Sequence, residues 1–459
     1  MGHGNMNILI FEWGSYNHND ILETFRKKGY GFTVVKHRFE DVNHDDEFVS
    51  RFDKQLDDGV YDFVYSTNFF PLVSECCNRK GVKYISWSYD APLDVPDIER
   101  TLGLPCNYAF MYDREQVQGY RNKGFDNVFH LPLAVNTKRL DRIHLSTAER
   151  KKYAAQISFV GNLYDSQMMN IRSILDEFHQ GYLDAVMKAQ SKIYGYYLVD
   201  DVLTDELMSD INRTVYDKTM EYRKQNCNGR SNIEVESGHG NNSIENGLND
   251  FVYYNKDNIE TGVKSINTKT DLDVSAAKNH DAKEDESENA NVLHISREAL
   301  SYAMAAQITR EERLLALKLL SGHYDVKLYS REKNDLLDKV TYMGTADYDK
   351  EMPKVFKSSD INLNMTLRCI RSGIPLRALD IMGAGGFLLS NYQQELAECF
   401  VDGEEAVMYE SIEDMYAKAS FYLANPDIRT EIARRGHDKV SRDYRYEDRI
   451  DEMLNAAFG

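Results

Sequence analysis

Residues Asn362–Glu395 predict a strand, a loop, a helix and a second strand, and they read NLNMTLRCIRSGIPLRALDIMGAGGFLLSNYQQE. The first strand should end near Asn364. Pro375 suits the first turn of a helix, because the amide that proline lacks has no helical partner there. The Gly385-Gly386 pair should end the helix and let the next strand enter closely. This order of elements predicts one unit of a parallel sheet.

The loop before this helix has the features of an anion site. It carries Arg368, Arg371, Ser372 and Gly373. The exposed amides and the positive dipole end of the helix favour an anion, and Arg377 in the first turn would add charge-assisted hydrogen bonds. Open α/β sheets bind nucleotides at the carboxyl ends of their strands. The pattern therefore indicates a phosphate site.

Asp380 extends this site toward a sugar. It lies three residues after Arg377, so the two side chains share a helix face. A carboxylate one turn beyond a phosphate site can accept hydrogen bonds from the two hydroxyls of a ribose. From spacing alone the alternative stays open, in which the aspartate is solvated and the arginines form weak surface pairs.

The alternation of strands and helices continues through most of the chain. Short apolar runs such as Asn7–Phe11 alternate with amphipathic stretches and predict an N-terminal Rossmann-like domain over residues 1–150. The alternation continues after Ile157–Val160 and predicts a second Rossmann-like domain over residues 155–440. We expect a last helix, 441–459, to pack back on the first domain.

Residues 225–291 interrupt the second domain. They are rich in Asn, Ser, Asp, Glu and Gly, and Phe251–Tyr254 is their one apolar cluster. Such a segment buries too little apolar area to offset the entropy of ordering. We therefore expect a disordered, low-complexity insertion here.

Composition excludes several classes of protein. The 459 residues are 42% hydrophobic, which is enough for sizeable cores and excludes a wholly disordered chain. The net charge of −19 disfavours nucleic acid as a partner. No apolar run reaches the ~18 residues of a membrane span, and the six cysteines form no CxxC pair, so we expect a cytoplasmic protein without an integral membrane segment. The signatures of P-loop NTPases, zincins and α/β-hydrolases are absent.

Several segments together resemble the group 1 glycosyltransferases with the GT-B fold (the family 4-like C-terminal region), and among them the CgeB-like spore-maturation branch. The similar segments are SGIPLRALDIMGAGGFLLSNYQQEL, GEEAVMYESIEDMYAKASFYLANPDIRTEIARRGHDKV, the terminal YRYEDRIDEML, WSYDAPL at Trp87–Leu93 and ISFVGNLY at Ile157–Tyr164. The resemblance implies an α/β protein of two Rossmann-like domains facing across a cleft. It further implies hexosyl transfer from a nucleotide-diphosphate sugar to an acceptor hydroxyl, with the donor as a substrate and no cofactor.

The resemblance also implies roles for residues in the second half. A helix glutamate binds the ribose in this family, and Asp380 stands at the matching position. Retaining members carry another glutamate eight residues earlier, where this chain has Ser372. This departure leaves the stereochemistry and the donor sugar open. Four further positions are expected to border the donor: Ser390, Asn391, Gly161 and Asn162.

The N-terminal half should supply the acceptor site and a general base. Asp90 in WSYDAPL and His18 in the first strand–helix loop, EWGSYNHND, are the candidate bases. Gly14 and Ser15 of the same loop should line the cleft. The alternatives are that Asp90 caps the turn before Pro92 and that the histidine is merely exposed. Arginines and a helix N-terminus can take the charge of the leaving diphosphate, so we expect transfer without a metal.

Two other functions stay open from the sequence. One is a catalytically silent nucleotide- or sugar-binding protein of a spore-coat or surface-assembly system, which the serine at position 372 keeps in contention. The other is a non-transferring enzyme of the same fold, such as a nucleotide-sugar epimerase. The acceptor stays open among a glycan, a protein and a small molecule.

Overall fold

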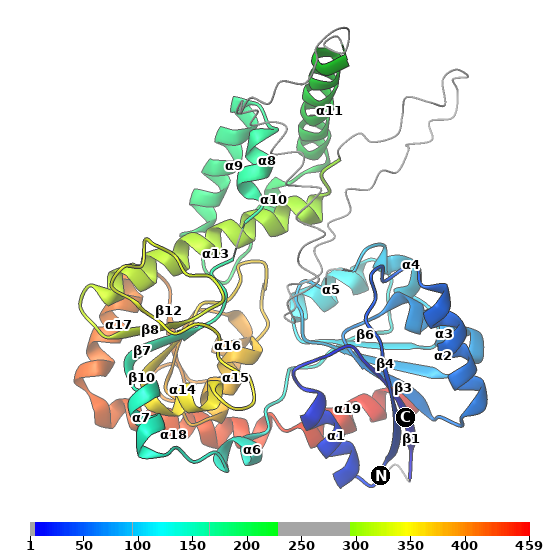
Figure 1. The fold of residues 1–459 in the computed structure, drawn as a ribbon, viewed down its shortest axis with the longest axis horizontal. Helices are drawn as coiled ribbons and strands as arrows, with labels where there is room; N and C mark the ends of the chain where they lie inside the picture. Colours follow the sequence, from blue (N-terminus) through cyan, green and yellow to red (C-terminus); the bar gives the residue numbers. More distant parts are fainter. Residues whose placement is uncertain (1–4, 94, 165, 228–293) are drawn as a thin grey trace, which may run out of the picture. The chain divides into compact units, whose positions relative to one another are not determined.

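The computed structural model describes residues 5–93, 95–164, 166–227 and 294–459 (Figure 1). The chain forms two compact units. Met1–Leu163 and Glu312–Gly459 make up the first unit, which holds both β-sheets. Tyr164–Glu311 make up the second, whose described elements are all helices.

Six parallel strands form the first sheet, in the order β2-β1-β3-β4-β5-β6. The strands are β1 (Asn7–Glu12), β2 (Gly31–Lys36), β3 (Phe63–Thr67), β4 (Lys83–Ser88), β5 (Asn107–Met111) and β6 (Val128–His130). The helices among and after them are α1 (His18–Lys27), α2 (Asp46–Asp58), α3 (Pro71–Lys80), α4 (Ile98–Leu102), α5 (Arg114–Asn122) and α6 (Thr137–Asp141).

Strand β1 is apolar along most of its length because both faces of its sheet are covered. Ile8 and Ile10 belong to one core together with Phe25 of α1. Leu9 and Phe11 belong to another core, with the aromatic side chains of α2. Successive side chains of a strand point to opposite faces, so a strand buried on both sides reads as a continuous apolar run.

Six parallel strands also form the second sheet, in the order β12-β11-β10-β7-β8-β9. They are β7 (Ala155–Val160), β8 (Val326–Tyr329), β9 (Thr341–Tyr342), β10 (Ser359–Asn364), β11 (Leu388–Asn391) and β12 (Val407–Tyr409). The helices of this half are α7 (Thr147–Tyr153), α14 (Met352–Ser358), α15 (Leu376–Gly383), α16 (Gln394–Cys399), α17 (Ile412–Ala424) and α18 (Pro426–Asp443). Two Rossmann-like parallel sheets in one chain confirm the predicted α/β, GT-B fold class.

Each sheet reverses its strand order at one place. In the first sheet the reversal lies between β1 and β3, and in the second it lies between β7 and β10. Loops that leave neighbouring strands in opposite directions open a crevice at the carboxyl ends of those strands, and open α/β sheets bind their ligands there. The two reversals therefore define where the site is to be sought.

The terminal helix α19 (Tyr446–Phe458) packs against α1, β4 and β5 of the first sheet. The rings of Trp87 and Tyr446 lie 5.9 Å apart, and the Lys83 ammonium lies 4.3 Å from the ring centre of Phe458. Helix α18 continues to Asp443, so the terminal helix begins after residue 441.

The helical unit contains α8 (Met168–Ser173), α9 (Glu177–Gln190), α10 (Val199–Val202), α11 (Asp205–Cys227) and the first part of α13 (Arg297–Ser321). The sequence analysis had included these helices in the second Rossmann-like domain. They form a unit of their own because they bury apolar side chains such as Leu183, Ile211 and Leu300 completely.

The insertion expected at residues 225–291 lies outside the described residues, apart from 225–227, which end α11. A search of the described helices for a membrane span found none with the necessary length and apolar character.

Gly386 generates a prediction about the entry into β11. A Cβ atom on this residue would lie 2.6 Å from Asn362 Nδ2 and 2.8 Å from the Phe356 carbonyl oxygen. Gly386→Ala should therefore lower the free energy of unfolding by about 1–3 kcal/mol, as overpacking does. The measurement is chemical denaturation.

The control is Gly119→Ala in α5, where a Cβ atom would meet nothing within 4 Å. This variant should be neutral or more stable by up to about 1 kcal/mol, because alanine favours a helix over glycine. Equal stabilities of the two variants would contradict the close approach at Gly386.

Candidate active site

Asp380 of α15 is buried, with 7% of its surface exposed. The Tyr348 hydroxyl donates a hydrogen bond to Asp380 Oδ1 at 3.0 Å. Arg377 Nη1 lies 3.8 Å from Asp380 Oδ2. The two residues thus interact one helical turn apart, in keeping with the spacing. Pro375 occupies the N-cap position, one residue before the helix, which begins at Leu376.

Burial raises the pKa of Asp380 to about 6, because a carboxylate without water is disfavoured. Arg377, the Tyr348 hydroxyl and Arg139 act in the opposite direction, and Asp20 adds to the rise. Two of these neighbours, Asp20 and Arg139, come from the N-terminal half of the chain. The pKa of the Asp380 carboxyl group therefore depends on charges from both halves of the chain.

Asp20 of α1, which is buried, forms an ion pair with the partly exposed Arg139 of α6. Arg139 donates from Nε to Asp20 Oδ1 at 3.0 Å and from Nη2 to Oδ2 at 3.2 Å. Asn136 Nδ2 donates to Asp20 Oδ1 at 2.9 Å. The guanidinium carbon lies 6.0 Å from the ring centre of Tyr348. These residues are not predicted from the sequence, because a lone charge on an amphipathic helix carries no signal of burial.

Glu12, at the end of β1, organises the first strand–helix loop. Its carboxylate accepts the backbone amides of Gly14 and Ser15, the latter at 2.7 Å, and pairs with His18 Nδ1. Gly14 has a φ of 103°, which favours glycine. Burial acts to raise the pKa of Glu12, but His18 and the two amides outweigh it and lower that pKa. Three of the predicted site residues, Gly14, Ser15 and His18, are thus held by a carboxylate that the sequence analysis did not single out.

This loop borders the segment that covers Asp380. The rings of Tyr16 and Tyr348 lie 5.4 Å apart, and Asn19 Nδ2 lies 3.5 Å from Asp349 Oδ2. Tyr348 therefore links the loop that carries His18 to the helix that carries Asp380, because it contacts both Tyr16 and Asp380.

Asp90 follows β4 beside the end of β3. Asn68 Nδ2 donates to Asp90 Oδ2 at 2.6 Å, and Asn68 Oδ1 accepts the Tyr89 amide at 2.8 Å. Asn68 itself adopts a φ of 66°. The carboxylate thus lies at the carboxyl edge of the first sheet, next to the strand reversal.

Gly161 and Asn162 lie at the reversal of the second sheet. The Gly161 amide donates to the Tyr329 carbonyl at 3.0 Å. Arg313 of α13 donates to the carbonyl oxygens of Asn162 and Met365, and so joins the loops that follow β7 and β10. Gly161 and Asn162 thus make these hydrogen bonds through their backbone groups.

Arg368 forms a buried ion pair with Glu312 of α13. Its Nε and Nη2 atoms lie 3.0 and 2.8 Å from Glu312 Oε2. Both side chains are only 4% exposed, so the charge of this arginine is balanced within the protein. The sequence pattern predicts this arginine at a phosphate site, because its carboxylate partner lies 56 residues away in the chain.

Asp113 binds the loop that precedes α15. Its Oδ2 accepts the amides of Arg371 at 2.7 Å and Ser372 at 3.3 Å, while Oδ1 accepts the first amides of α5. Gly373 lies against Tyr112, since a Cβ atom there would come within 2.7 Å of the ring. Asp113 and Tyr112 thus hold the loop that precedes α15.

Ser372 is fully buried between two carboxylates. Its Oγ lies 3.0 Å from Asp113 Oδ1 and 2.8 Å from Glu395 Oε1. Glu395 Oε2 pairs with His130 Nε2 at 2.8 Å. Burial acts to raise the pKa of Glu395, and His130, the Arg114 amide and the serine together lower it.

Ser390 and Asn391 end β11 and are buried. Asn364 Nδ2 donates to Ser390 Oγ at 2.9 Å, and the Thr366 amide donates to Asn391 Oδ1 at 2.7 Å. Both residues therefore hold the loop after β10. Within the described ranges, no three His, Cys, Asp or Glu side chains are grouped as a metal site requires.

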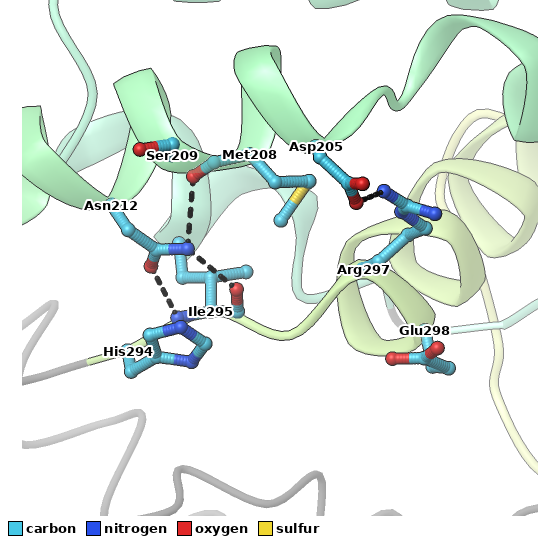
Figure 2. Close-up of a pocket in the computed structure, with 8 residues that line it drawn as sticks. All are labelled: Asp205, Met208, Ser209, Asn212, His294, Ile295, Arg297 and Glu298. Carbon is cyan, nitrogen blue, oxygen red and sulfur yellow. Dashed lines mark hydrogen bonds and ion pairs between the residues drawn. The ribbon is translucent and has the colours of Figure 1, made fainter. Parts of the chain in front are cut away.

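A separate pocket of about 570 Å³ lies in the helical unit (Figure 2). Asn212 spans it by bonding both backbone groups of Ile295, at 2.8 and 3.0 Å, and Asp205 pairs with Arg297 beside it. None of the predicted site residues lines this pocket.

The C-terminal part of the chain is similar to a known protein family. Residues 309–455 match the protein family described as glycosyl transferase-like. The matched segment contains β10, α15 and β11, and with them Arg377 and Asp380. No curated protein matches the chain. The similarity to this family thus covers the carboxyl-terminal third of the chain, including Asp380.

Solved structures similar to the chain include three glycosyltransferase-related proteins. They are Anabaena Alr3699/HepE in complex with UDP-glucose (7% identity, 98% of this chain and 99% of that chain, TM-score 0.48), a glycosyltransferase from Rickettsia africae (8%, 100% and 100%, TM-score 0.46) and sucrose-phosphate synthase from Thermosynechococcus elongatus (10%, 98% and 98%, TM-score 0.46). Similarities at this level carry no argument about activity or substrate.

The buried carboxyl of Asp380 makes stability depend on pH. Its pKa rises from 3.8 to about 6 on folding, so between these values the folded state binds more protons than the unfolded state. The free energy of unfolding should therefore fall as the pH rises through this window. Relative to Asp380→Asn, the wild type should lose about 3 kcal/mol between about pH 4 and pH 6, and the difference should be constant above about pH 7.

Urea unfolding of both proteins between pH 4 and pH 8 measures this difference. Asp57→Asn on α2 is the surface control, because the Asp57 side chain is 58% exposed and its carboxylate pairs with Lys80 Nζ at 2.6 Å. A pH-independent difference for Asp380→Asn would contradict the effect of burial.

Proposed function

We propose that this protein is a glycosyltransferase that moves a hexose from a nucleoside-diphosphate donor to an acceptor hydroxyl. One observation carries the proposal: the glycosyl transferase-like segment, residues 309–455, contains the β10–α15 unit in which Asp380 and Arg377 interact. Helix α15 follows β10, which is one of the two strands at the reversal of the second sheet. Open α/β sheets bind nucleotides at such a reversal. Membership of the CgeB-like branch is part of the proposal and is supported by the residue pattern.

In this proposal Asp380 binds the ribose and Arg377 binds the diphosphate. The Tyr348 hydroxyl that donates to Asp380 at 3.0 Å makes the kind of contact that a ribose hydroxyl would make. The Arg377 side chain is 25% exposed, so it can reach a ligand. A chain with a net charge of −19 repels an anionic donor unless such a local positive group attracts it.

The other predicted donor residues shape the loops around this position. Arg371, Ser372 and Gly373 hold the loop before α15 against Asp113 and Tyr112. The remaining donor residues fix the neighbouring strand ends: Gly161, Asn162, Arg368, Ser390 and Asn391.

The chemistry is a displacement at the anomeric carbon. The acceptor oxygen forms the new bond, the bond from this carbon to the diphosphate breaks, and the electron pair leaves with the nucleoside diphosphate. Arg377 and the N-terminus of α15 would stabilise the leaving charge without a metal. The acceptor proton passes to a base from the first sheet, for which His18 and Asp90 are the candidates.

We further propose a cytoplasmic location. The six cysteines of the sequence form no CxxC pair and no regular framework, which suits a reducing compartment.

A catalytically silent binding protein is the second candidate function. It is favoured by Ser372, which stands where retaining members of the resembling family carry a glutamate, and whose hydroxyl is bound to Asp113 and Glu395. Such a protein would bind the nucleotide sugar without turning it over.

Calorimetric titration and thermal unfolding with UDP, GDP, ADP and dTDP, and with their glucose conjugates, test the proposed function. One nucleoside diphosphate should raise the unfolding temperature saturably, since a ligand at 100 times its Kd stabilises by about 2.7 kcal/mol. Release of that diphosphate from its sugar conjugate, with a panel of hydroxyl acceptors, separates a transferase from a silent binder. Absence of stabilisation by every diphosphate would overturn the proposal.

Arg377→Ala should weaken nucleoside diphosphate about tenfold or more and the free nucleoside little. The reason is that a lost hydrogen bond to a charged group costs about 1.5–3 kcal/mol, and only the diphosphate offers that partner. Titration of both ligands into wild type and variant measures the two ratios.

The control is Arg442→Ala on α18, an exposed arginine paired with the adjacent Asp443. It should leave both affinities unchanged. If Arg377→Ala weakens diphosphate and nucleoside equally, the arginine shapes the base pocket or the fold and does not bind the phosphates.

A further inference from the structure

The carboxylate of Glu12 holds a histidine and a loop at the same time. It is 6% exposed and lies at the end of β1. The amides of Gly14 and Ser15 and the ring nitrogen Nδ1 of His18 all bond to it, and the Ser15 hydroxyl lies 3.3 Å from its Oε2. The loop therefore orients the carboxylate, and the carboxylate orients the ring.

This contact selects one tautomer of His18. A carboxylate only accepts hydrogen bonds, so the Nδ1 atom that faces it must carry a proton. In the neutral ring the lone pair then lies on Nε2. Burial acts to raise the pKa of Glu12, yet the ring and the two amides lower it overall, so the carboxylate is ionised at neutral pH. The His18 side chain is 19% exposed, and a solvent molecule or substrate can therefore reach it.

The position of the loop relates this histidine to the proposed donor site. The ring of Tyr16 lies 5.4 Å from that of Tyr348, and the Tyr348 hydroxyl donates to Asp380. On the other side of His18, Asn19 meets Asp349. Residues on both sides of the histidine thus contact the segment that covers Asp380. An acceptor placed next to the sugar of a donor held by Asp380 would lie beside this loop.

We propose that His18 Nε2 is the general base of the transfer and that Glu12 is a positioning residue that fixes the tautomer and orientation of the ring. This inference rests on the proposed function. The acceptor O–H proton passes to Nε2 and the acceptor oxygen bonds to the anomeric carbon. The bond from that carbon to the diphosphate breaks, and its electron pair leaves with the nucleoside diphosphate.

The same assignment determines the stereochemistry. A protein base serves an oxygen that attacks from the face opposite to the leaving group, and a single displacement of this kind inverts the anomeric carbon. In a front-face transfer the leaving diphosphate itself would take the proton. The product of this protein should therefore have the inverted configuration.

The experiment compares wild type, Glu12→Gln, His18→Ala and Asp90→Asn, using the sugar donor identified by the nucleotide screen. Glutamine can still accept the loop amides through its oxygen, but its NH₂ group would donate to Nδ1 and move the ring proton to Nε2. Glu12→Gln should lower kcat by about 10²–10⁴-fold, the range of general base catalysis, with the donor Kd within about twofold of wild type. His18→Ala should cost as much, and the double variant no more, because the two residues act as a unit.

Two further measurements separate this role from a structural one. Glu12→Asp, which keeps the charge, should recover part of the activity. The anomeric configuration of the wild-type product is read by NMR.

Retention of configuration, or a kcat of Glu12→Gln within about threefold of wild type over the whole pH range, would overturn the inference while leaving the transferase activity established. A large loss in Asp90→Asn alone, with His18→Ala active, would transfer the base role to Asp90 and equally overturn it. If Glu12→Gln does not fold, His18→Ala and the product configuration decide. A wild type that binds nucleoside diphosphate but transfers no sugar would overturn both proposals.

Discussion

The carboxylate of Asp113 joins two loops that follow strands of different sheets. It caps α5 by accepting the amides of Glu115 and Gln116, and it accepts the amides of Arg371 and Ser372 from the loop before α15. One carboxylate thus satisfies amides from both loops. The course of the loop before α15 sets where this helix begins, and hence where Arg377 and Asp380 stand.

Buried charges at the carboxyl edges of both sheets are each balanced by a specific partner. Glu12 meets His18, Glu312 meets Arg368, and Asp20 meets Arg139. An unpaired charge in such a place would cost several kcal/mol, whereas a paired one contributes little to stability and much to geometry. The site is thus a set of compensated charges in which the removal of either partner changes the orientation of the other.

The connection from β7 to β8 has a special place in this arrangement. In a simple parallel unit one helix would cross between these strands, but here the connection includes the helical unit, Tyr164–Glu311. Helix α13 leaves that unit, and its residues Glu312 and Arg313 then bind the loops after β7 and β10. The loops at the reversal of the second sheet are therefore held by a helix that begins in another unit.

The features that the sequence by itself determined are local. Apolar runs of strand length between amphipathic stretches were enough for two parallel sheets, since periodicity and burial on both faces are written in neighbouring residues. The three-residue spacing was enough to predict that Arg377 and Asp380 share a face, and the close approach at Gly386 was expected from its glycine pair.

The partners of the site residues were decided by the tertiary structure alone. Arg368 was expected at a phosphate but pairs with Glu312, 56 residues away in the chain. Ser372 was expected at the sugar but lies between Asp113 and Glu395. Burial and charge compensation depend on which elements pack together, and that follows from the cooperative assembly of the sheets rather than from residues adjacent in the chain.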